Sequence, residues 1–520
     1  MKQLPLFKMT TRRSSLAFIP LLLVLLVWGS CRKDFDFEAS SGALEFSRDT
    51  VFLDTVFSNI SSSTRALKVF NRTNTDINIP SIRLGEGENS GYRLNVDGLA
   101  GKEFTNIPLM ANDSLFIFIE VTFALDPTPT NQFLYTDAIE FDSGPNLQEV
   151  QLVTLVQDAI FLFPQELDNG ITETLVLGVN ENGDEIHVEG FVLEEDELNF
   201  TNEKPYVIYG YAAVSDGATL TMEAGTRVFF HENSGILVDE NASLRINGSL
   251  SSDPVALENE VIFEGDRLEP QLSNTPGQWA GIWFLAGSRN NEIDYLTIKN
   301  ATIGLLVQGD NDLSSPSLSL RNSQVHNSAN TNLFARTARI IAENVVLGNA
   351  GNNSFHGNLG GDYRFTHSTI ANFSRNGFRN GTALQLSNTA DNLGADLTRA
   401  DFNNCIINGN TAFELLLLDN GSNSFNFSFT NCLLQFQDIS NQFEGNPLYD
   451  FMDNTRYNGI ILNGDAAFLN AQATDFRIGP ESVARGNADP NLALEVPLDI
   501  LGIDRTNLPD IGAYQIIQQN

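Results

Sequence analysis

Basic residues are scarce in this chain of 520 residues. Lys and Arg number 30 against 65 Asp and Glu, which gives a formal net charge of −35. So acidic a surface repels phosphate backbones, and the composition therefore argues against a nucleic-acid partner. It also argues against attraction to anionic lipid by charge alone.

Cysteine and histidine are also rare. The chain has three Cys and five His, and it contains no Cys-x-x-Cys. Thioredoxin-like chemistry is therefore excluded, and no second pair or flanking His completes a zinc site around Cys405 and Cys432. We predict no cofactor and no bound metal. Two interpretations of this cysteine pair stay open, namely two buried thiols or a disulfide.

No long amphipathic helix is visible in the sequence. Phe (37) and Gly (40) are abundant instead, and Asn and Ser are frequent. Short apolar runs separated by turn residues are typical of β-structure, so we predict an all-β protein.

The N-terminus reads as a targeting segment. The basic stretch "KMTTRR" precedes the apolar run "LAFIPLLLVLLVWGSC", which is short for a membrane span and ends in small residues before Cys31. The run resembles a bacterial lipoprotein signal, and the acidic "RKDFDFEASSG" resembles the export signal of Bacteroidetes surface lipoproteins. This implies a signal peptide over 1–30, a lipid on Cys31, a tether over 31–42 and an outer-membrane location at the cell surface. An uncleaved anchor, an ordinary secretory signal and the periplasmic face remain alternatives.

Residues 43–158 alternate apolar and polar side chains in short runs, with turn residues about every ten positions. This pattern is typical of a β-sandwich. The stretches "STRALKVFNRTNTDINIPSIRL" and "ANDSLFIFIEVTF" resemble the immunoglobulin-like modules found beside the anchors of bacterial surface proteins. Such modules are usually spacers, and a ligand-binding sandwich is the alternative.

A repeat occupies the second half of the chain. The stretches "LSLRNSQVHNS", "RIIAENVVLGN", "YRFTHSTIANF", "ADFNNCIINGN" and "FSFTNCLLQF" superpose. We name the aligned polar position the asparagine column, and its members are Asn322, Asn344, His367, Asn404 and Asn431. The next position holds Ser323, Val345, Ser368, Cys405 and Cys432. Phe365, Phe402 and Phe429 stand two residues before the column.

A spacing mostly of 22 to 27 residues between short strands is the signature of a solenoid, because each turn must share its core with its neighbours. Parallel crossovers are right-handed almost without exception. We therefore predict a right-handed parallel β-helix over 206–520, after a connecting or capping segment over 159–205. Inward-pointing members of the asparagine column would hydrogen-bond along the stack. Cys405 and Cys432 then share a column on adjacent turns.

The end of the chain resembles the closing segment of right-handed β-helix proteins of the pectin-lyase-like superfamily. The matching residues are Asp499, Gly502 and Arg505, followed by "DIGAYQ" from Asp510. Enzymes of that superfamily cleave polysaccharides. Polygalacturonases among them need an Arg-x-Lys that is missing here, and lyases need Ca²⁺-binding carboxylates beside an Arg or Lys.

Two groups of residues are candidates for binding. Trp279 and Trp283 can stack on sugar rings, and a spacing of four within a strand would place both on one face, although core packing is the simpler explanation. The second group lies around a surplus of chain between His367 and Asn404, which predicts a loop over 374–396. Its candidates are Arg364, Arg375, Phe378 and Arg379. Pairing of these arginines with nearby aspartates is the alternative.

Two functions follow. The first is a non-catalytic surface lipoprotein whose β-helix binds a polysaccharide or a surface protein. The second is a polysaccharide lyase or hydrolase, and only this alternative would require Ca²⁺. Basic and acidic residues converging on one outer face would favour the enzyme, and dispersed charges would favour binding.

Overall fold

The computed structural model describes residues 37–123, 132–167, 170–179, 184–310, 312–375, 377 and 379–517. Cys31, the signal segment and Phe378 lie outside these residues. The described chain is all-β and divides into two compact units. The first comprises residues up to Leu53 with Ser61–Phe123 and Leu134–Thr154, and the second comprises the remainder.

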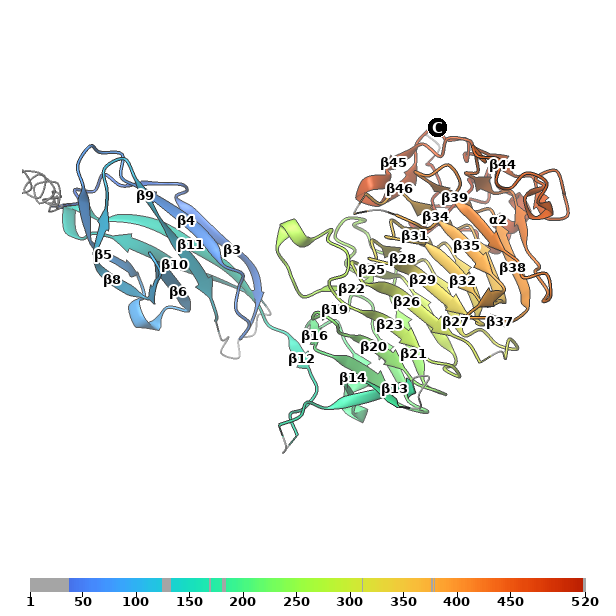
Figure 1. Ribbon diagram of the computed structural model, residues 1–520, viewed down its shortest axis with the longest axis horizontal. Helices are drawn as coiled ribbons and strands as arrows, with labels where there is room; N and C mark the ends of the chain where they lie inside the picture. The colour runs from blue at the N-terminus through green and yellow to red at the C-terminus, as the bar shows by residue number, and fades with distance from the viewer. Residues whose placement is uncertain are drawn as a thin grey trace, which may run out of the picture. The chain divides into compact units, whose positions relative to one another are not determined.

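The first unit consists of two mostly antiparallel sheets (Figure 1). The six-stranded sheet contains β1 (Glu38–Ala39), β5 (Ile77–Leu84), β10 (Gln132–Phe141), β11 (Gln148–Gln157), β3 (Thr50–Phe57) and β8 (Glu103–Leu109). The five-stranded sheet contains β2 (Glu45–Phe46), β4 (Arg65–Phe70), β9 (Ser114–Val121), β6 (Tyr92–Val96) and β7 (Leu99–Gly101). The sheets face each other, because Phe46 packs on Phe141 at 4.7 Å and the Tyr92 hydroxyl donates to Thr154.

The second unit consists of three long sheets, which we name sheets I, II and III. Consecutive strands along the chain go to different sheets, so most strands pair in parallel with the strand three positions later; β28 pairs with β31, for example, and Val325 lies opposite Leu347. Figure 1 shows the strands stacked in rows along this unit.

Sheet I has eleven strands: β12 (Ile160–Leu162), β16 (Tyr206–Ile208), β19 (Arg227–Phe230), β22 (Val261–Gly265), β25 (Leu296–Lys299), β28 (Gln324–His326), β31 (Val346–Gly348), β34 (Thr369–Asn372), β39 (Ile406–Gly409), β42 (Leu433–Leu434) and β44 (Ile461–Leu462). Sheet II has ten: β13 (Thr174–Val179), β14 (Glu185–Val192), β17 (Tyr211–Val214), β20 (Gly235–Val238), β23 (Gly281–Phe284), β26 (Ile303–Gln308), β29 (Thr331–Arg336), β32 (Phe355–Asn358), β35 (Leu384–Ser387) and β40 (Leu415–Leu418). Only the β13–β14 pair of sheet II is antiparallel.

Sheet III also has ten strands: β15 (Asn199–Phe200), β18 (Thr219–Met222), β21 (Ser243–Asn247), β24 (Asn291–Asp294), β27 (Leu318–Arg321), β30 (Arg339–Glu343), β33 (Gly361–Thr366), β38 (Leu397–Asn403), β41 (Ser428–Thr430) and β43 (Tyr457–Asn458). Strands β12, β14 and β15 fall within 159–205. The segment expected to be a connector therefore supplies early strands of all three sheets, which its short apolar runs did not reveal.

One continuous core lies between the three sheets, and aromatic rings stack along it. Phe365 lies 5.2 Å from Phe402, Phe402 lies 5.1 Å from Phe429, and Phe429 lies 5.6 Å from Tyr457, with interplanar angles of 14° or less. These distances are close to the spacing of adjacent strands. The aligned Phe positions of the repeat therefore form a buried stack.

The surplus of chain between His367 and Asn404 is divided between two corners. Strand β35 lies inside this stretch and joins sheet II, so the single loop expected over 374–396 is wrong. One excursion covers 373–383, and the other covers 388–396 and contains the hairpin of β36 (Thr389–Ala390) and β37 (Leu393–Gly394). The extra residues still leave at the corners, because the core has no room for them.

After β44 the chain leaves the three sheets. It forms the pair β45 (Phe468–Asn470) and β46 (Asp475–Ile478), the short helix α2 (Pro490–Glu495) and irregular stretches to residue 517. We name residues 465–517 the C-terminal segment. Phe476 and Ile500 pack with Val346 and Ala371 of sheet I, so this segment covers part of the outer face of that sheet.

Candidate functional site

A pocket opens on the outer face of sheet I, beside the C-terminal segment. In register across this sheet, Gly348 pairs with Ala371 and Ala371 with Asn408, and Gln435 follows Leu434 in the same frame. The residue before each of these four belongs to the core, so the side chains of this row on sheet I face outward. Phe476 lies directly over Gly348, whereas Asn408 and Gln435 lie at the pocket.

The pocket has a volume of about 470 Å³. Three side-chain amides line it: Asn408 in β39, Gln435 just after β42 and Asn463 just after β44. Two aromatic rings, those of Phe373 and Phe468, also line it. The two ring centroids are 5.9 Å apart and the rings meet edge to face. Residues 464–467 and Ala471 complete the lining. Polar amides and aromatic rings together are the groups that bind sugar hydroxyls and the apolar faces of sugar rings.

The side-chain amides differ in their hydrogen bonding. Asn463 exchanges two hydrogen bonds with the backbone of Phe436, at 2.7 and 2.8 Å. Across the described part of the chain, the amides of Asn408 and Gln435 have no protein partner. Asn408 is only 7% exposed, yet neither polar atom of its amide is among the buried atoms that lack a partner, so the amide opens into the pocket. Its donor and acceptor are therefore available to a ligand or to water in the pocket.

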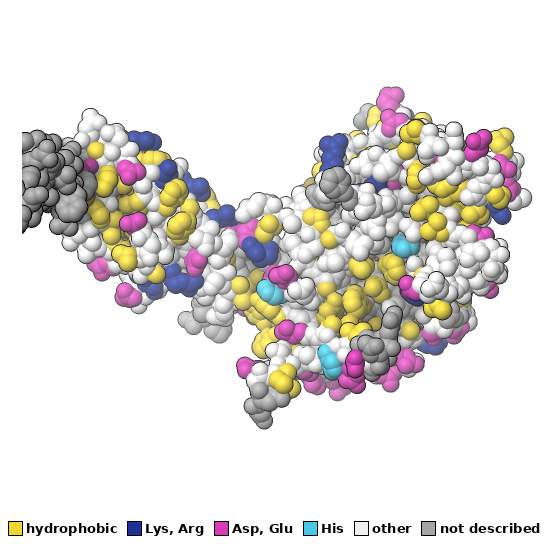
Figure 2. All heavy atoms as spheres, viewed as in Figure 1, with side chains coloured by type: hydrophobic (Ala, Val, Ile, Leu, Met, Phe, Trp, Pro, Cys, Tyr) yellow, Lys and Arg dark blue, Asp and Glu magenta, His cyan; other side chains and the backbone are white. Residues whose placement is uncertain are grey.

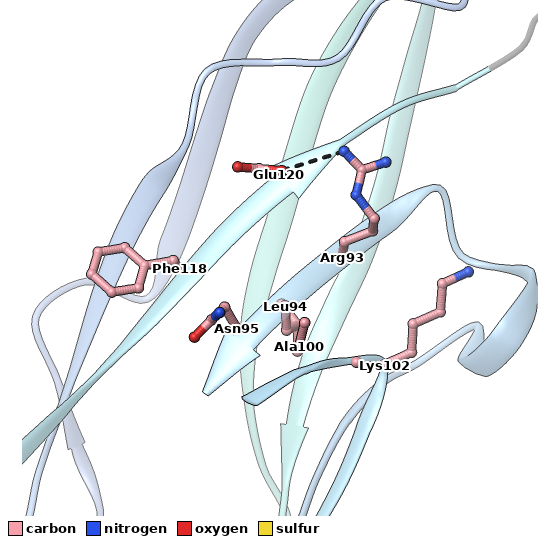
Figure 3. Close-up of a pocket in the computed structure, with 8 residues that line it drawn as sticks. Arg93, Leu94, Asn95, Ala100, Lys102, Phe118 and Glu120 are labelled. Atoms are coloured by element: carbon pink, nitrogen blue, oxygen red, sulfur yellow. Dashed lines mark hydrogen bonds and ion pairs between the residues drawn. The ribbon is translucent and has the colours of Figure 1, made fainter. Parts of the chain in front are cut away.

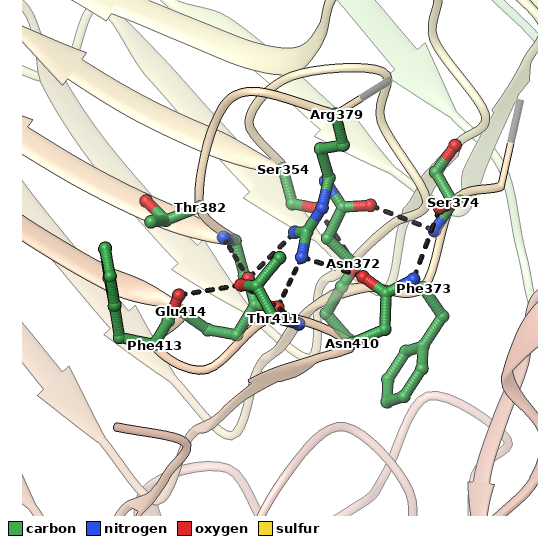
Figure 4. Close-up of polar contacts among 12 residues, drawn as sticks. Ser354, Asn372, Phe373, Ser374, Arg379, Thr382, Asn410, Thr411, Phe413 and Glu414 are labelled. Atoms are coloured by element: carbon green, nitrogen blue, oxygen red, sulfur yellow. Dashed lines mark hydrogen bonds and ion pairs between the residues drawn. The ribbon is translucent and has the colours of Figure 1, made fainter. Parts of the chain in front are cut away.

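The excursion next to the pocket is fixed by a buried ion pair (Figure 4). Arg379 donates to both carboxylate oxygens of Glu414, at 2.5 and 2.8 Å, and to Asn410 Oδ1 at 2.8 Å. Glu414 also accepts from the backbone amides of Ala383 and Thr411. Arg379 was expected at a recognition surface, but its side chain is 5% exposed and that of Glu414 is 0% exposed. Arg379 therefore positions the excursion and does not reach a ligand.

Arg375 remains exposed on the same excursion, two residues after Phe373. With the Gln472 amide oriented so that its oxygen faces the guanidinium, that oxygen accepts from Arg375, with 2.7 Å to Nη2. Gln472 follows Ala471, which lines the pocket. The structure thus places Arg375 beside the pocket. Phe378, the third candidate of this excursion, lies outside the described residues.

The two tryptophans lie on different faces. Trp279 is 1% exposed, stacks on Phe230 at 4.2 Å and belongs to the core. Trp283 points outward from β23 and lies 5.4 Å from Tyr211. The expectation of one shared face is wrong, because Trp279 precedes the strand and Gly281 at its start has a φ of +149°.

Trp283 belongs to an apolar row on the outer face of sheet II. In register it neighbours Leu237 and Leu306, and Leu306 in turn neighbours Phe334. Figure 2 shows a patch of hydrophobic side chains where these strands run.

Arg364 lies on the outer face of sheet III, on a different sheet from the pocket. It stands between Tyr363 and Phe365, which are both in the core. The carboxylate of Asp362, two residues before Arg364, is already paired with another arginine. Asp362 accepts two hydrogen bonds from Arg399, at 2.6 and 2.8 Å, and this hydrogen-bonded pairing raises the pKa of Arg399. Arg364 therefore does not share a site with Arg375.

The asparagine column occupies the corners between sheets III and I. All five members have φ between 45° and 54°, a conformation that Asn tolerates well. Asn344 Nδ2 donates to Asn322 Oδ1 at 2.9 Å, and Asn404 Nδ2 lies 2.9 Å from His367 Nε2. The column is therefore connected in pairs along the stack.

The expectation that these side chains point inward is wrong. Asn344, Asn404 and Asn431 bond the backbone of the C-terminal segment, at Leu498, Asp489 and Asn487 respectively. The following position points inward instead, since Val345, Cys405 and Cys432 belong to the core. A left-handed corner turns the column residue away from the core.

Asp499 and Arg505, which the sequence singled out as candidates for a closing segment, attach the C-terminal segment to the asparagine column. Arg505 is fully buried and donates to Asn344 Oδ1 at 2.9 Å and to the carbonyls of Gly512 and Ala513. Asp499 accepts from the backbone amides of Ile503 and Gln515. Burial lowers the pKa of Arg505 to about 10, and the nearby carboxylates of Asp499 and Asp510 oppose that shift. Arg505 and Asp499 therefore have a structural role in this segment.

Cys405 and Cys432 are free, buried thiols in this structure. The Cys405 amide lies 3.4 Å from Cys432 Sγ, so the pair stacks on adjacent turns. Burial, with Cys405 as neighbour, raises the pKa of Cys432 well above its usual value. Within the described ranges, no cluster of three His, Cys, Asp or Glu residues suits a metal ion, and no helix has the length and apolarity of a membrane span.

Comparisons with known proteins do not identify a family. No family model matches the chain, and no curated protein matches it. Solved structures match parts of it: the ASH/PapD-like domain of human CEP192 (11% identity, 23% of this chain and 86% of that one, TM-score 0.15) and the E. coli chaperone DraB (13%, 24% and 58%, TM-score 0.16). A family 123 glycoside hydrolase from Clostridium perfringens matches similarly (11%, 23% and 26%, TM-score 0.16). Scores this low carry no argument about function.

The sequence did contain a signal for the pocket that was missed. Asn408 and Gln435 occupy the same position of the two most similar repeats, three residues after Cys405 and Cys432. Two aligned amides at an outward position of adjacent turns indicate a polar surface row. Phe468 gave no such signal, because it comes from outside the repeat.

Proposed function

We propose that this chain is a lipid-anchored outer-membrane protein at the cell surface that binds a polysaccharide in the pocket on sheet I. Its three sheets then form a right-handed parallel β-helix, and its first unit is an immunoglobulin-like sandwich. The pairing of most strands with the strand three positions later supports the helical winding. Two packed sheets of alternating burial support the sandwich.

One observation carries the binding proposal. Asn408 and Gln435 present two side-chain amides without protein partners in the described structure, side by side at a pocket that Phe373 and Phe468 also line. Each amide offers a donor and an acceptor, which matches vicinal hydroxyls of a sugar. A ligand that covers these amides must hydrogen-bond to them, because burying an amide without a partner costs free energy.

The lining favours binding over hydrolysis. Asp465 is the only carboxylate among the lining residues, and its Oδ1 already accepts from the Ala467 amide at 2.8 Å. Glycoside hydrolysis generally requires two carboxylates about the scissile bond. The basic residue beside the pocket, Arg375, suits a carboxylate or hydroxyl of the ligand instead.

The test is a glycan array probed with the full chain, followed by titration of each hit against variants. Asn408→Ala and Gln435→Ala should each weaken binding by about 1–3 kcal/mol, the cost of an unpaired ligand group. Gln442→Ala removes an exposed amide outside the pocket and serves as the matched control. If both pocket variants bind with unchanged affinity, the pocket is not the binding site. If the protein cleaves a glycan that it binds, the proposal of a non-catalytic binding protein is wrong.

The anchor has its own test. Cys31→Ala should leave the protein unlipidated and move it out of the outer-membrane fraction. The mass of the N-terminal peptide of the wild-type protein reports the acyl chains directly. Persistence of Cys31→Ala in the membrane fraction contradicts a lipid anchor, whatever the glycan array shows.

A further inference from the structure

The outer face of the five-stranded sheet in the first unit exposes aromatic rings. Strand β9 alternates, with Ile117 and Ile119 fully buried and Phe116 and Phe118 facing outward at 49% and 46% exposure. The two exposed rings are nearly parallel, with centroids 6.2 Å apart. Two half-exposed phenylalanines side by side form an apolar surface that water solvates poorly.

Cations border these rings. Lys68 Nζ lies 5.1 Å from the Phe116 ring centroid and 5.2 Å from that of Phe70, and the Arg72 guanidinium lies 4.2 Å from Phe70. Long basic side chains around exposed aromatic rings are typical of surfaces that lie at a membrane–water interface, where the rings enter the acyl boundary and the cations stay among the headgroups.

A pocket lies on each side of Phe118. One, of about 520 Å³, is lined by Phe37, Met110 and Phe116 together with Asp97 and Asp113. The other, of about 440 Å³, is lined by Arg93, Lys102 and Glu120 together with Phe118 (Figure 3).

The charges of these two pockets match a zwitterionic headgroup. Arg93 and Glu120 form an exposed ion pair at 3.3 Å, and its two charges suit the phosphate and the ammonium group of a headgroup. Lys102 Nζ, beside this pair, donates to the carbonyls of Glu88 and Ser90. Asp97 and Asp113 disfavour strongly anionic lipid, in agreement with the net charge of −35. The surface therefore matches phosphatidylethanolamine better than an anionic lipid.

The chain enters the structure at this face. Phe37 is the first described residue, and it lines the pocket with Phe116 and Phe118. Cys31 precedes it by only six residues, which span at most about 20 Å when fully extended. A lipid on Cys31 would therefore hold the bilayer within reach of this face.

We propose that this aromatic face, defined by Phe37, Met110, Phe116 and Phe118 with Lys68 and Arg72 at its border, docks on the zwitterionic interface of the membrane that holds the anchor. The inference rests on the proposed lipidation of Cys31. It makes the first unit a membrane-contacting module and not only a spacer.

The test places a tryptophan in the face of the full, lipidated chain. Phe116→Trp is reconstituted in vesicles of phosphatidylethanolamine and phosphatidylcholine whose acyl chains carry bromine, a short-range quencher. The matched control is Phe52→Trp, because Phe52 is 64% exposed on β3 of the opposite sheet. Fluorescence of the wild-type chain is subtracted. We expect several-fold quenching of the tryptophan at 116 and none at 52.

The outcomes separate the alternatives. Equal quenching at both positions, or none at 116 in protein whose Cys31 is shown to be acylated, overturns the docking face and leaves the anchor intact. If Cys31 is not acylated, the anchor fails, and the face is tested by vesicle flotation of the soluble chain. Phe116→Ser/Phe118→Ser should then float at least tenfold less than Phe52→Ser, since each ring contributes more than 1 kcal/mol when buried. The double variant could instead lose self-association in solution or glycan binding while its flotation is unchanged. Either result assigns the aromatic face to another partner and overturns the proposed membrane docking.

Discussion

Asn404 and His367 lie on adjacent turns of the chain, with Asn404 Nδ2 2.9 Å from His367 Nε2. His367 is fully buried there, at the position that other turns fill with Asn. Burial, with Arg505 nearby, lowers its pKa well below the usual value. The imidazole is therefore neutral in the folded protein, and the unfolded chain binds one more proton below about pH 6.5.

The second unit should therefore lose stability as the pH falls. With a depressed folded pKa, His367 lowers the free energy of unfolding by up to about 1.4 kcal/mol per pH unit below pH 6.5. His367→Asn places the common residue of the asparagine column at a position with a φ of 47°. This variant should lose the contribution of His367 to the pH dependence of the unfolding free energy. Urea unfolding at pH 7 and pH 5, followed by fluorescence of Trp279 and Trp283, measures the difference. An equal pH dependence in both proteins contradicts the assignment.

Phe402→Ala should cost about 3–5 kcal/mol of unfolding free energy, because it leaves a cavity between Phe365 and Phe429. Thermal unfolding followed by the same fluorescence checks this. Met452→Ala, at a side chain 85% exposed in the same unit, is the control and should change little. A loss below about 1 kcal/mol in Phe402→Ala would show that the stack is not a core.

Glu414→Ala should destabilise the excursion beside the pocket by about 3–5 kcal/mol, because it leaves the Arg379 guanidinium buried without its partner. Limited proteolysis within 373–383 should become faster. The comparison variant is Arg336→Ala, whose partner Asp391 is 76% exposed and whose loss should cost less than about 1 kcal/mol. Equal protease resistance of Glu414→Ala and wild type contradicts a stabilising role of the pair.

Arg505→Leu should loosen the C-terminal segment, since it removes the donors to Asn344, Gly512 and Ala513. Faster hydrogen exchange of the backbone amides after residue 485, with unchanged exchange in sheet II, is the expected readout. Arg485→Leu alters an arginine of the same segment that is less buried than Arg505 and serves as the control. If the two variants exchange alike, Arg505 does not hold the segment.

Neither Cys405 nor Cys432 should react with a thiol reagent in the native Cys31→Ala chain, because both are fully buried and burial raises the pKa of the Cys432 thiol. Both should react after unfolding without a reductant. A single assay in denaturant decides between free thiols and a disulfide, since a disulfide would leave no reactive thiol.

Much of the architecture could be predicted because the repeat has a physical cause. In neighbouring parallel strands, equivalent positions of the repeat lie next to each other. Phe402 therefore lies on Phe429 and Cys405 beside Cys432, and alignment of the repeats predicts both pairs. The direction of the asparagine column could not be predicted this way. A positive φ at the corner turns the side chain outward, and alignment carries no information on φ.

The site was less predictable for a related reason. Arg379 and Arg375 look equivalent in "RNGFRNG", but only Arg379 meets a buried carboxylate, and Glu414 lies 35 residues away. The pocket also needs Phe468, which comes from a segment outside the repeat. Long-range pairings of this kind leave no mark on local sequence.

The attachment of the C-terminal segment to the asparagine column sets an order of events for the newly made chain. Asn344 bonds partners 154 and 161 positions further along the chain, so its corner cannot make all its hydrogen bonds before residue 505 has been synthesised. A chain that ended before residue 487 would contain all three sheets, but the side-chain amides of Asn344, Asn404 and Asn431 would lack their backbone partners in the C-terminal segment. Folding of this corner therefore cannot be complete before synthesis has passed residue 505.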